Sequence, residues 1–360
     1  EEGVVKVRII TKKGSKEEEL PLTEKIADGT VITPYLISLD DKVVMASDEF
    51  QRITSHQKDA VINYNKGKFN VKASELKDQD IVDLMDFVLD ATTNPRREMK
   101  SMNIQSYASP EGEIDKNENL AKDRAESAKS AVVRKMKKMK FELGNTDAFY
   151  SLDPKGEDWP GFKAEVEKTD HEDKELILRV LQMTSDLNKR EQEIRNMAKT
   201  YTFLEKEVLP QLRRAQLSLS YDKVGYSDEE LKELSKTNPD TLNVEELLFT
   251  ATLYTDLSEQ LRVYKEAQRL FPADWRTSNN VGYILYLQGD LEAAGTNFEK
   301  AGESSENSTV KNNIGAVAHM KGDRERAMEL FTAAGSSSET DYNMGLLNIQ
   351  QGLYDDAVSN

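Results

Sequence analysis

The sequence predicts an α+β protein in which a small α/β sandwich domain precedes an all-α solenoid of repeated helical hairpins. Three observations lead to this prediction. The chain has 360 residues, more than one ordinary core accommodates, so two or three domains are expected. Strand-like and helix-like patterns alternate between residues 59 and 139. Residues 279–302 and 312–335 are two copies of one pattern.

Residues 1–58 are expected to be the remnant of a β-rich module. The stretches 4–10 (VVKVRII) and 31–37 (VITPYLI) are rich in strand-forming side chains, and Gly and Pro residues punctuate them. The chain opens at Glu1 without Met or a signal peptide and ends at Asn360 inside a helical pattern. We therefore expect a segment of a longer protein.

The α/β domain is expected to span residues 59–225. Residues 60–65 (AVINYN) and 102–107 (MNIQSY) predict strands. A helix is expected after Ser74, and a longer one from Asp115 or Lys116 to about Met139. Apolar side chains share one face of the first helix at intervals of three to four residues: Ile81, Leu84, Met85, Val88 and Leu89. This order of elements predicts two helices on one face of a sheet.

An insertion of mixed character is expected at about residues 141–209. It begins with a loop-like stretch rich in Gly and Pro and continues as a charged helical stretch. Residues 212–221 (LRRAQLSLSY) then alternate apolar and polar side chains, which predicts a strand that returns to the sheet. The acidic residues 226–243 are expected to be a linker.

The last part of the chain, residues 244–360, repeats a helical hairpin. The two clearest copies start 312 − 279 = 33 residues apart and share ten of 24 positions. A third copy begins at Tyr342, and a weaker first copy covers 244–274. Small residues recur where the helices of one hairpin should touch: Gly282, Gly315 and Gly345 on the first helix, Ala294, Ala327 and Ala357 on the second.

This pattern resembles the tetratricopeptide repeat, whose period is about 34 residues. Phe298 and Phe331, each followed three residues later by Ala, fit the same resemblance. The usual aromatic near the start of each repeat is missing, and the last step is 342 − 312 = 30 residues. The resemblance implies about 3.5 repeats, truncated at the C-terminus, that bind an unidentified protein or peptide in a concave groove.

The candidate groove residues lie on the first helix of each hairpin, three residues before the packing glycine and onward at i, i+4 and i+7. Asparagine can donate to and accept from an extended peptide backbone, and tyrosine suits interfaces. In the alternative interpretation, the tyrosines fill the core between repeats and the asparagines are solvated. The candidate groove residues are Asn279, Tyr283, Tyr286, Asn312 and His319.

A second resemblance lies in residues 106–125 (SYASPEGEIDKNENLAKDRA), which are similar to the signature of the outer-membrane protein A (OmpA)-like C-terminal domain, a periplasmic peptidoglycan-binding module. The similarity covers about residues 59–222. The variant SYASPEG, a GEDWPGF-like stretch at 156–162 and a following repeat array also resemble outer-membrane-associated proteins of Gram-negative bacteria. The matching positions are Gly112, Asn117, Leu120, Arg124 and Ala125.

The resemblance implies a site for the zwitterionic end of diaminopimelate, gripped in that family by an Arg and an Asp. The matching Arg is Arg124, which shares a helix face with Asn117, but Ser109 stands in the Asp position. Such a loss costs about 1.5–3 kcal/mol, so weak peptidoglycan binding is expected, with Glu111 as a substitute for the missing carboxylate. Alternatively, Arg124 is a structural ion-pair partner and Asn117 serves the start of the helix.

Composition excludes several classes of function. A net charge of −16 argues against nucleic-acid binding, and no apolar run approaches the ~20 residues of a membrane span. The chain has no Cys, no phosphate-binding loop and no zinc-protease motif. The three histidines, His56, His171 and His319, lie in different segments. We therefore expect no enzymatic activity, no cofactor and no metal.

The sequence thus predicts a non-enzymatic cell-envelope scaffold, periplasmic or outer-membrane-associated, that binds a protein partner through its repeats and peptidoglycan weakly. The alternative is a pure interaction or assembly factor of the outer membrane that binds no glycan.

Overall fold

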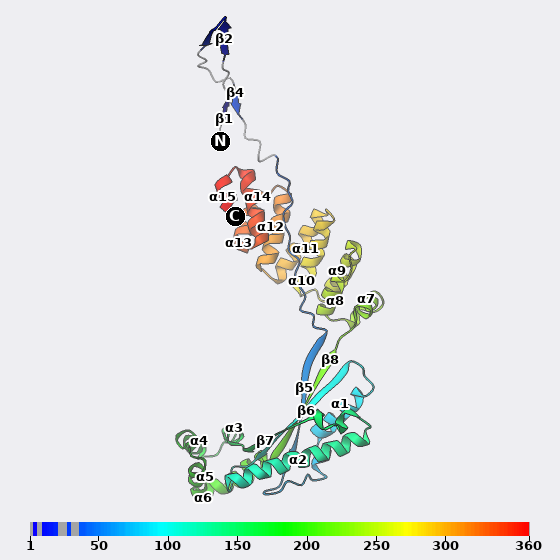
Figure 1. Ribbon diagram of the computed structural model, residues 1–360, viewed down its shortest axis with the longest axis vertical. Coiled ribbons are helices and arrows are strands. Elements are labelled where there is room, and N and C mark those ends of the chain that lie inside the picture. Colours follow the sequence, from blue (N-terminus) through cyan, green and yellow to red (C-terminus); the bar gives the residue numbers. More distant parts are fainter. Residues whose placement is uncertain (1–2, 6–8, 21–26, 30–35, 360) are drawn as a thin grey trace. The chain divides into compact units, whose positions relative to one another are not determined.

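The computed structural model describes residues 3–5, 9–20, 27–29 and 36–359 (Figure 1). The chain divides into two compact units. Gln51–Gly225 form one, and Glu1–Phe50 together with Tyr226–Asn360 form the other. The α/β unit is therefore an insertion between the N-terminal residues and the helical repeats.

Four short strands form two local antiparallel pairs at the N-terminus. β1 (Gly3–Val5) pairs with β4 (Ala27–Gly29), and β2 (Ile9–Lys13) pairs with β3 (Lys16–Leu20). The strand expected at 31–37 falls mainly on residues outside the described ranges. Residues 37–50 form no helix or strand. The assignment of all of residues 1–58 to a β-rich module is therefore wrong for this stretch, which runs extended along the repeats (Figure 1).

The α/β unit is built on a four-stranded sheet in the order β5-β8-β6-β7. Its strands are β5 (Ile53–Asn63), β6 (Arg97–Ala108), β7 (Tyr150–Glu157) and β8 (Arg214–Val224). β8 is antiparallel to both β5 and β6, with Leu217 opposite Ile104, so the strand expected near 212–221 lies in the sheet. β7 is parallel to β6 at the edge. It was expected to be loop because Pro154 interrupts any strand pattern, but an edge strand tolerates proline.

Two helices cover the sheet and share one core with it. α1 (Gln79–Ala91) contributes Ile81 and Leu84, and α2 (Ile114–Lys138) contributes Ala125 and Ala128. Leu89, expected on the buried face of α1, is 48% exposed.

The insertion forms a helical lobe with a core of its own around Trp159, Phe162 and Leu204. Its helices are α3 (Trp159–Glu167), α4 (Lys174–Met183), α5 (Leu187–Asn196) and α6 (Ala198–Phe203). A π-helical turn, Leu204–Val208, and a 3-10 turn, Leu209–Leu212, lead into β8.

The repeat array begins with a helix in the stretch expected to be a linker. α7 (Asp228–Thr237) starts at Ser227, whose side chain and that of Glu230 cap the helix reciprocally. Leu231 is buried in the same core as Leu247 of the next helix. The linker assignment is therefore wrong. Charged residues dominate 226–243, so the few apolar residues of this helix did not stand out. Leu231 and Leu234 pack against the core of the repeats.

Eight further helices form four hairpins (Figure 1). The first two hairpins are α8 (Val244–Thr252) with α9 (Leu257–Leu270), and α10 (Trp275–Leu287) with α11 (Leu291–Ser304). The next two are α12 (Ser308–Met320) with α13 (Arg324–Ala334), and α14 (Ser338–Gln351) with α15 (Tyr354–Ser359). Two of the three glycines expected at helix contacts, Gly282 and Gly315, pack closely against the partner helix. A Cβ on Gly282 would lie 2.7 Å from the ring of Phe298, and one on Gly315 would lie 2.7 Å from the ring of Phe331.

These contacts give a matched pair of substitutions. We expect Gly282→Ala to destabilise the array by about 1–3 kcal/mol, because a methyl group forced against a buried ring strains a close-packed hairpin. In Gly345→Ala the new Cβ meets its nearest atom, the carbonyl oxygen of Ala357, at 3.7 Å. Alanine is also the better helix former by about 1 kcal/mol, so this control should be neutral or stabilising. Thermal unfolding of the two variants measures the difference, and equal melting temperatures would contradict the packing role.

Candidate functional site

The first helices of three hairpins each direct a buried asparagine at the extended residues 39–50, which we call the groove segment. The asparagines are Asn280 of α10, Asn313 of α12 and Asn343 of α14. Each stands two residues before the packing glycine of its helix. Positions two residues apart on an α-helix differ in direction by roughly 200°. The asparagine side chains therefore point away from the hairpin partner and into the groove.

Each asparagine pairs with both backbone groups of one residue of the groove segment. The amide N–H of Lys42 donates to Asn343 Oδ1 at 2.7 Å, and Asn343 Nδ2 donates to the carbonyl oxygen of Lys42 at 2.8 Å. Asn313 makes the same pair with Val44, both at 2.7 Å. Asn280 makes it with Ala46, at 2.8 and 2.9 Å.

The three carboxamides thus act like the edge of a neighbouring β-strand, advancing two segment residues per repeat. We call these six hydrogen bonds the asparagine ladder. The ladder residues run from Lys42 over α14 to Ala46 over α10.

Asn279 and Asn312, the asparagines named from the sequence, form a second layer. Asn312 Nδ2 donates to the carbonyl oxygen of Lys42 at 2.9 Å, and Asn279 Nδ2 donates to that of Val44 at 3.1 Å. The carboxamides also bond one another in sequence, Asn343 to Asn312 to Asn313 to Asn279 to Asn280, at 2.9–3.2 Å. Such a connected network strengthens each of its bonds and holds the side chains in one orientation.

His319 and Tyr286 hold the residue that precedes the ladder. His319 Nδ1 lies 2.7 Å from Asp41 Oδ1, and both side chains are fully buried. The hydroxyl of Tyr286 donates to the carbonyl oxygen of Asp41 at 3.0 Å. Burial alone would lower the pKa of His319, but the hydrogen bond and charge of Asp41 outweigh it, so the pKa lies above its ordinary value of 6.5.

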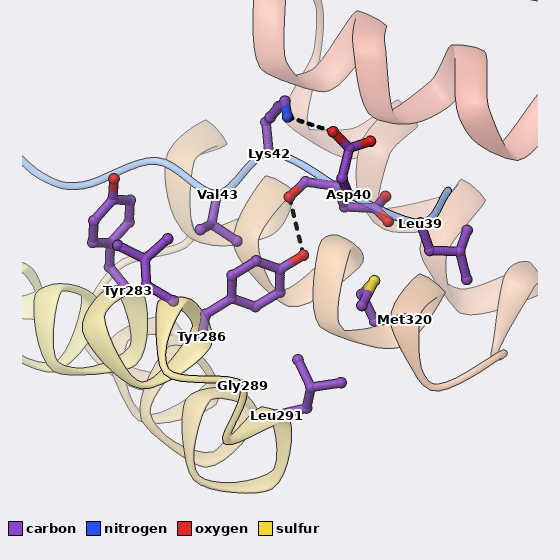
Figure 2. A pocket seen from close by; sticks show the side chains of 11 residues that line it. Leu39, Asp40, Lys42, Val43, Tyr283, Tyr286, Gly289, Leu291 and Met320 are labelled. Carbon is purple, nitrogen blue, oxygen red and sulfur yellow. Dashed lines mark hydrogen bonds and ion pairs between the residues drawn. The ribbon is translucent and has the colours of Figure 1, made fainter. Parts of the chain in front are cut away.

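A pocket of about 490 Å³ lies beside the groove segment (Figure 2). Tyr283 and Tyr286 line it from the array, and Leu39 and Val43 line it from the segment. Both tyrosines also pack against the apolar core of the repeats. Tyr283 and Tyr286 therefore line the pocket beside the groove segment and also pack in the core of the repeats. For these two side chains, groove contact and core packing do not exclude each other.

At its far end the groove segment reaches α8. Glu245 Oε2 accepts from the amide N–H of Glu49 at 2.6 Å, and Arg276 forms an ion pair with Glu245 at 2.5 Å. The rings of Phe50 and Phe249 stack with their centroids 4.5 Å apart.

Sequence reasoning missed the ladder residues Asn280, Asn313 and Asn343. It chose the first asparagine of each Asn-Asn pair by counting three residues back from the packing glycine. A signal for the second asparagine was present, because this position is Asn in all three copies, whereas the first position becomes Tyr342 in the last one.

Arg124, the expected peptidoglycan contact, is completely buried in the α/β unit. Its guanidinium donates to three backbone carbonyl oxygens, of Asn65 at 3.2 Å, Lys68 at 3.0 Å and Tyr107 at 2.6 Å. Burial lowers its pKa to about 10. Arg124 therefore has no exposed guanidinium for the expected ligand contact, and it instead joins α2 to the loop after β5 and to β6.

The other three predicted residues also have internal partners. Ser109 Oγ donates to Glu111 Oε1 at 2.5 Å, and Glu111 forms ion pairs with Arg213 at 2.7 Å and Lys66 at 2.9 Å. Burial alone would raise the pKa of Glu111, but Ser109 and the two cations lower it below its usual value. Asn117 donates to Glu157 at 2.8 Å. Glu111 is thus engaged by protein cations and is not free to receive a ligand ammonium.

Removal of the Arg124 side chain should unfold or strongly destabilise the α/β unit. Arg124→Ala leaves three buried carbonyl oxygens without this donor, at about 1–3 kcal/mol for each group left unpaired. Arg134→Ala, an exposed arginine on the same helix, is the control and should change stability by about 0.5 kcal/mol or less. Denaturant unfolding would measure both. Similar stabilities for the two variants would contradict the structural role of Arg124.

Among the residues that the structure describes, no group of three or more His, Asp or Glu side chains is arranged to hold a metal ion. None of the helices in this part of the chain combines the length and apolar character needed to cross a bilayer.

The four helical hairpins, packed in series, make this a helical repeat protein. No protein-family model and no curated protein sequence matches the chain. Two crystal structures of MamA are similar to it at 21% identity and a TM-score of 0.32, over 37% of this chain and 81% or 75% of theirs. The APC/C hetero-tetramer Cut9–Hcn1 is similar at 13% identity and a TM-score of 0.22, over 69% of this chain and 66% of that one. These similarities are too low to assign a function.

Proposed function

We propose that this protein is a non-enzymatic binding scaffold whose repeat array holds extended peptide segments through the asparagine ladder. The observation that carries the proposal is the set of six hydrogen bonds from Asn280, Asn313 and Asn343 to the backbone of alternate residues. Because the ladder contacts backbone, it suits segments that differ in their side chains.

The buried side chains of the groove need hydrogen-bond partners from an occupant. Five carboxamides are almost completely buried beneath the groove segment. When the segment leaves, water replaces the six ladder hydrogen bonds, each of which stabilises the occupied groove by about 0.5–1.5 kcal/mol. An extended peptide backbone restores these bonds, and so does the chain's own segment.

A partner therefore competes with the groove segment. Ile53 of β5 pairs with Val224 of β8, and the amide N–H of Gly225 donates to the carbonyl oxygen of Arg52 at 2.6 Å. The chain thus enters and leaves the α/β unit at adjacent points. The segment, which ends just before this entry, is tethered near the repeats, which begin just after the exit. Such a tether gives the segment a high effective concentration.

The test uses the full chain with Val44→Pro and Ala46→Pro together, which we call the released variant. Proline removes two of the three backbone donors of the ladder. A fluorescent peptide of residues 36–50 is titrated against it and followed by anisotropy. We expect saturable binding to the released variant and weak binding to the unaltered chain. Binding should be lost when Asn313→Ala is added.

Two measurements on the released variant come first. Hydrogen exchange establishes that residues 39–50 have left the groove, and circular dichroism establishes that the helices remain folded. If both conditions hold and the peptide does not bind, the proposal is contradicted.

The cell-envelope location and weak peptidoglycan binding rest on the sequence resemblance and stay proposals. The burial of Arg124 and the ion pairs of Glu111 support the alternative of an interaction or assembly factor that binds no glycan. We expect weak sedimentation or none with purified peptidoglycan sacculi, and tight sedimentation would contradict both alternatives. If the protein does sediment with sacculi, and a folded Arg124→Lys variant sediments equally well, the glycan binds at a different site.

A further inference from the structure

One side chain of the groove segment is held as closely as its backbone. Asp41 lies one residue before the first ladder residue, and its carboxylate is buried against His319. Its neighbour Asp40 is exposed and contacts Lys42 and Tyr342 at the surface. The groove therefore buries the carboxylate of Asp41 and leaves that of its neighbour Asp40 exposed to solvent.

The partners of His319 fix its protonation. Nδ1 faces the carboxylate of Asp41, which accepts hydrogen bonds. Nε2 lies 3.0 Å from Gln350 Oε1, and this same oxygen accepts from Arg324 Nε at 3.0 Å. Because an arginine nitrogen can only donate, the group that faces His319 is the amide oxygen. Both ring nitrogens therefore face acceptors, and both carry hydrogen in the imidazolium form.

The charged groups around this ring come from each element packed on it. Asp41 comes from the groove segment, Arg324 from the start of α13, and Gln350 from α14 is neutral. Arg324 is a cation and opposes protonation, so the charge on His319 depends on the aspartate. A segment without a carboxylate at this place would leave the imidazolium buried without a counter-charge.

We propose that the groove selects extended segments that carry an aspartate one residue before the first ladder residue, and that binding such a segment places a proton on His319. The proposal rests on the proposed function, since it names the class of peptide that the ladder accepts. Aspartate fits better than glutamate, because Tyr286 holds the carbonyl oxygen of this residue and so fixes the distance from backbone to His319.

A second feature sets the register. Ala46, the last ladder residue, is 6% exposed, so a small side chain is required five residues after the aspartate. The ligand is therefore an extended segment with the pattern Asp, four residues, Ala or Gly. The groove segment is one example, and a partner with this pattern would displace it.

The test titrates labelled peptides of residues 36–50 against the released variant at pH 6 and pH 8. We expect Asp41→Asn in the peptide to weaken binding at least tenfold at pH 6. Asp40→Asn, the same change one residue earlier, should weaken it less than threefold. The unaltered peptide should bind more weakly at pH 8 than at pH 6, whereas the Asp41→Asn peptide should lose this dependence.

Calorimetry of the released variant in two buffers with different ionisation enthalpies measures proton uptake directly and needs no substitution at His319. We expect net proton uptake with the unaltered peptide and none with the Asp41→Asn peptide. Equal binding of the Asp40→Asn and Asp41→Asn peptides, or equal proton uptake, would overturn the inference while leaving the proposed function intact. Absence of binding by every peptide would instead contradict the proposed function.

Discussion

Asn313→Ala is expected to release the groove segment from the array. Asn313 sits at the middle of the ladder and binds both backbone groups of Val44, and its carboxamide also joins Asn312 to Asn279. Its loss leaves several buried polar groups unpaired, for a total of about 3–5 kcal/mol. That corresponds to a population of the released state larger by a factor of about 10² to 10³ or more.

Hydrogen exchange of the peptide that spans residues 39–50, followed by mass spectrometry, measures this effect. Exchange there should accelerate by the same factor while the core helices keep their protection. Asn297→Ala is the matched control, because Asn297 lies in the same array but bonds Ala293 and Gln268 on α11 and α9, outside the groove. Unchanged exchange of the segment in Asn313→Ala would show that the ladder does not hold it.

His319→Gln is expected to have the second large effect, and the effect should depend on pH. Removal of one partner of a buried ion pair costs about 3–5 kcal/mol, because the other charge stays buried. Glutamine retains part of the hydrogen bonding, so the lower end of this range is expected. Limited proteolysis within residues 39–50 should therefore be faster in His319→Gln than in the unaltered chain.

The pH dependence follows from the direction of the His319 pKa. Its pKa is raised in the folded state, so the folded state binds the proton more tightly than the unfolded one. The resulting stability is fully present below about pH 6.5, the ordinary value for histidine, and is lost as the pH rises through the raised value.

The difference in stability between the unaltered chain and His319→Gln should therefore shrink between pH 6 and pH 9. Melting temperatures of both proteins across this range measure it. A difference that stays constant would mean that the histidine is neutral in the groove.

The sequence predicted the repeats well because their determinants are local. The glycines that meet Phe298 and Phe331, and the turns at Gly289 and Gly322 with positive φ, recur at a fixed interval. Tyr286 and His319, selected by the same periodicity, both contact Asp41 of the groove segment. The periodicity could not choose between Asn312 and Asn313, because neighbouring residues differ by about 100° around a helix and both directions meet the groove.

Residues 39–50 occupy the groove through contacts with residues far away in the sequence, and no local sequence pattern predicts such contacts. Lys42 and Asn343 are 301 residues apart in the sequence, and Ala46 and Asn280 are 234 apart. The expected β-rich module of residues 1–58 includes residues 39–50 only because they follow the strand-like stretches 4–10 and 31–37. The strand-like conformation of residues 39–50 is real, but asparagine side chains take the place of the neighbouring strand.

The burial of Arg124 was not predicted for a related reason. Its position in a motif is visible in the sequence, but its three carbonyl partners lie on two other segments, and two of them belong to the loop after β5. Burial of a charged side chain among backbone acceptors is a tertiary property. The motif in residues 106–125 therefore shows where Arg124 lies in the sequence but not that its guanidinium bonds backbone carbonyl oxygens.

The central claim is that the array holds an extended segment by its backbone at every second residue. Amide-resolved hydrogen exchange of the unaltered chain tests this claim most directly. The N–H groups of Lys42, Val44 and Ala46 donate to the ladder, whereas those of Val43 and Met45 have no acceptor among the described residues. We expect slow exchange at 42, 44 and 46 and fast exchange at 43 and 45. Uniformly fast exchange from 42 to 46 would contradict the claim.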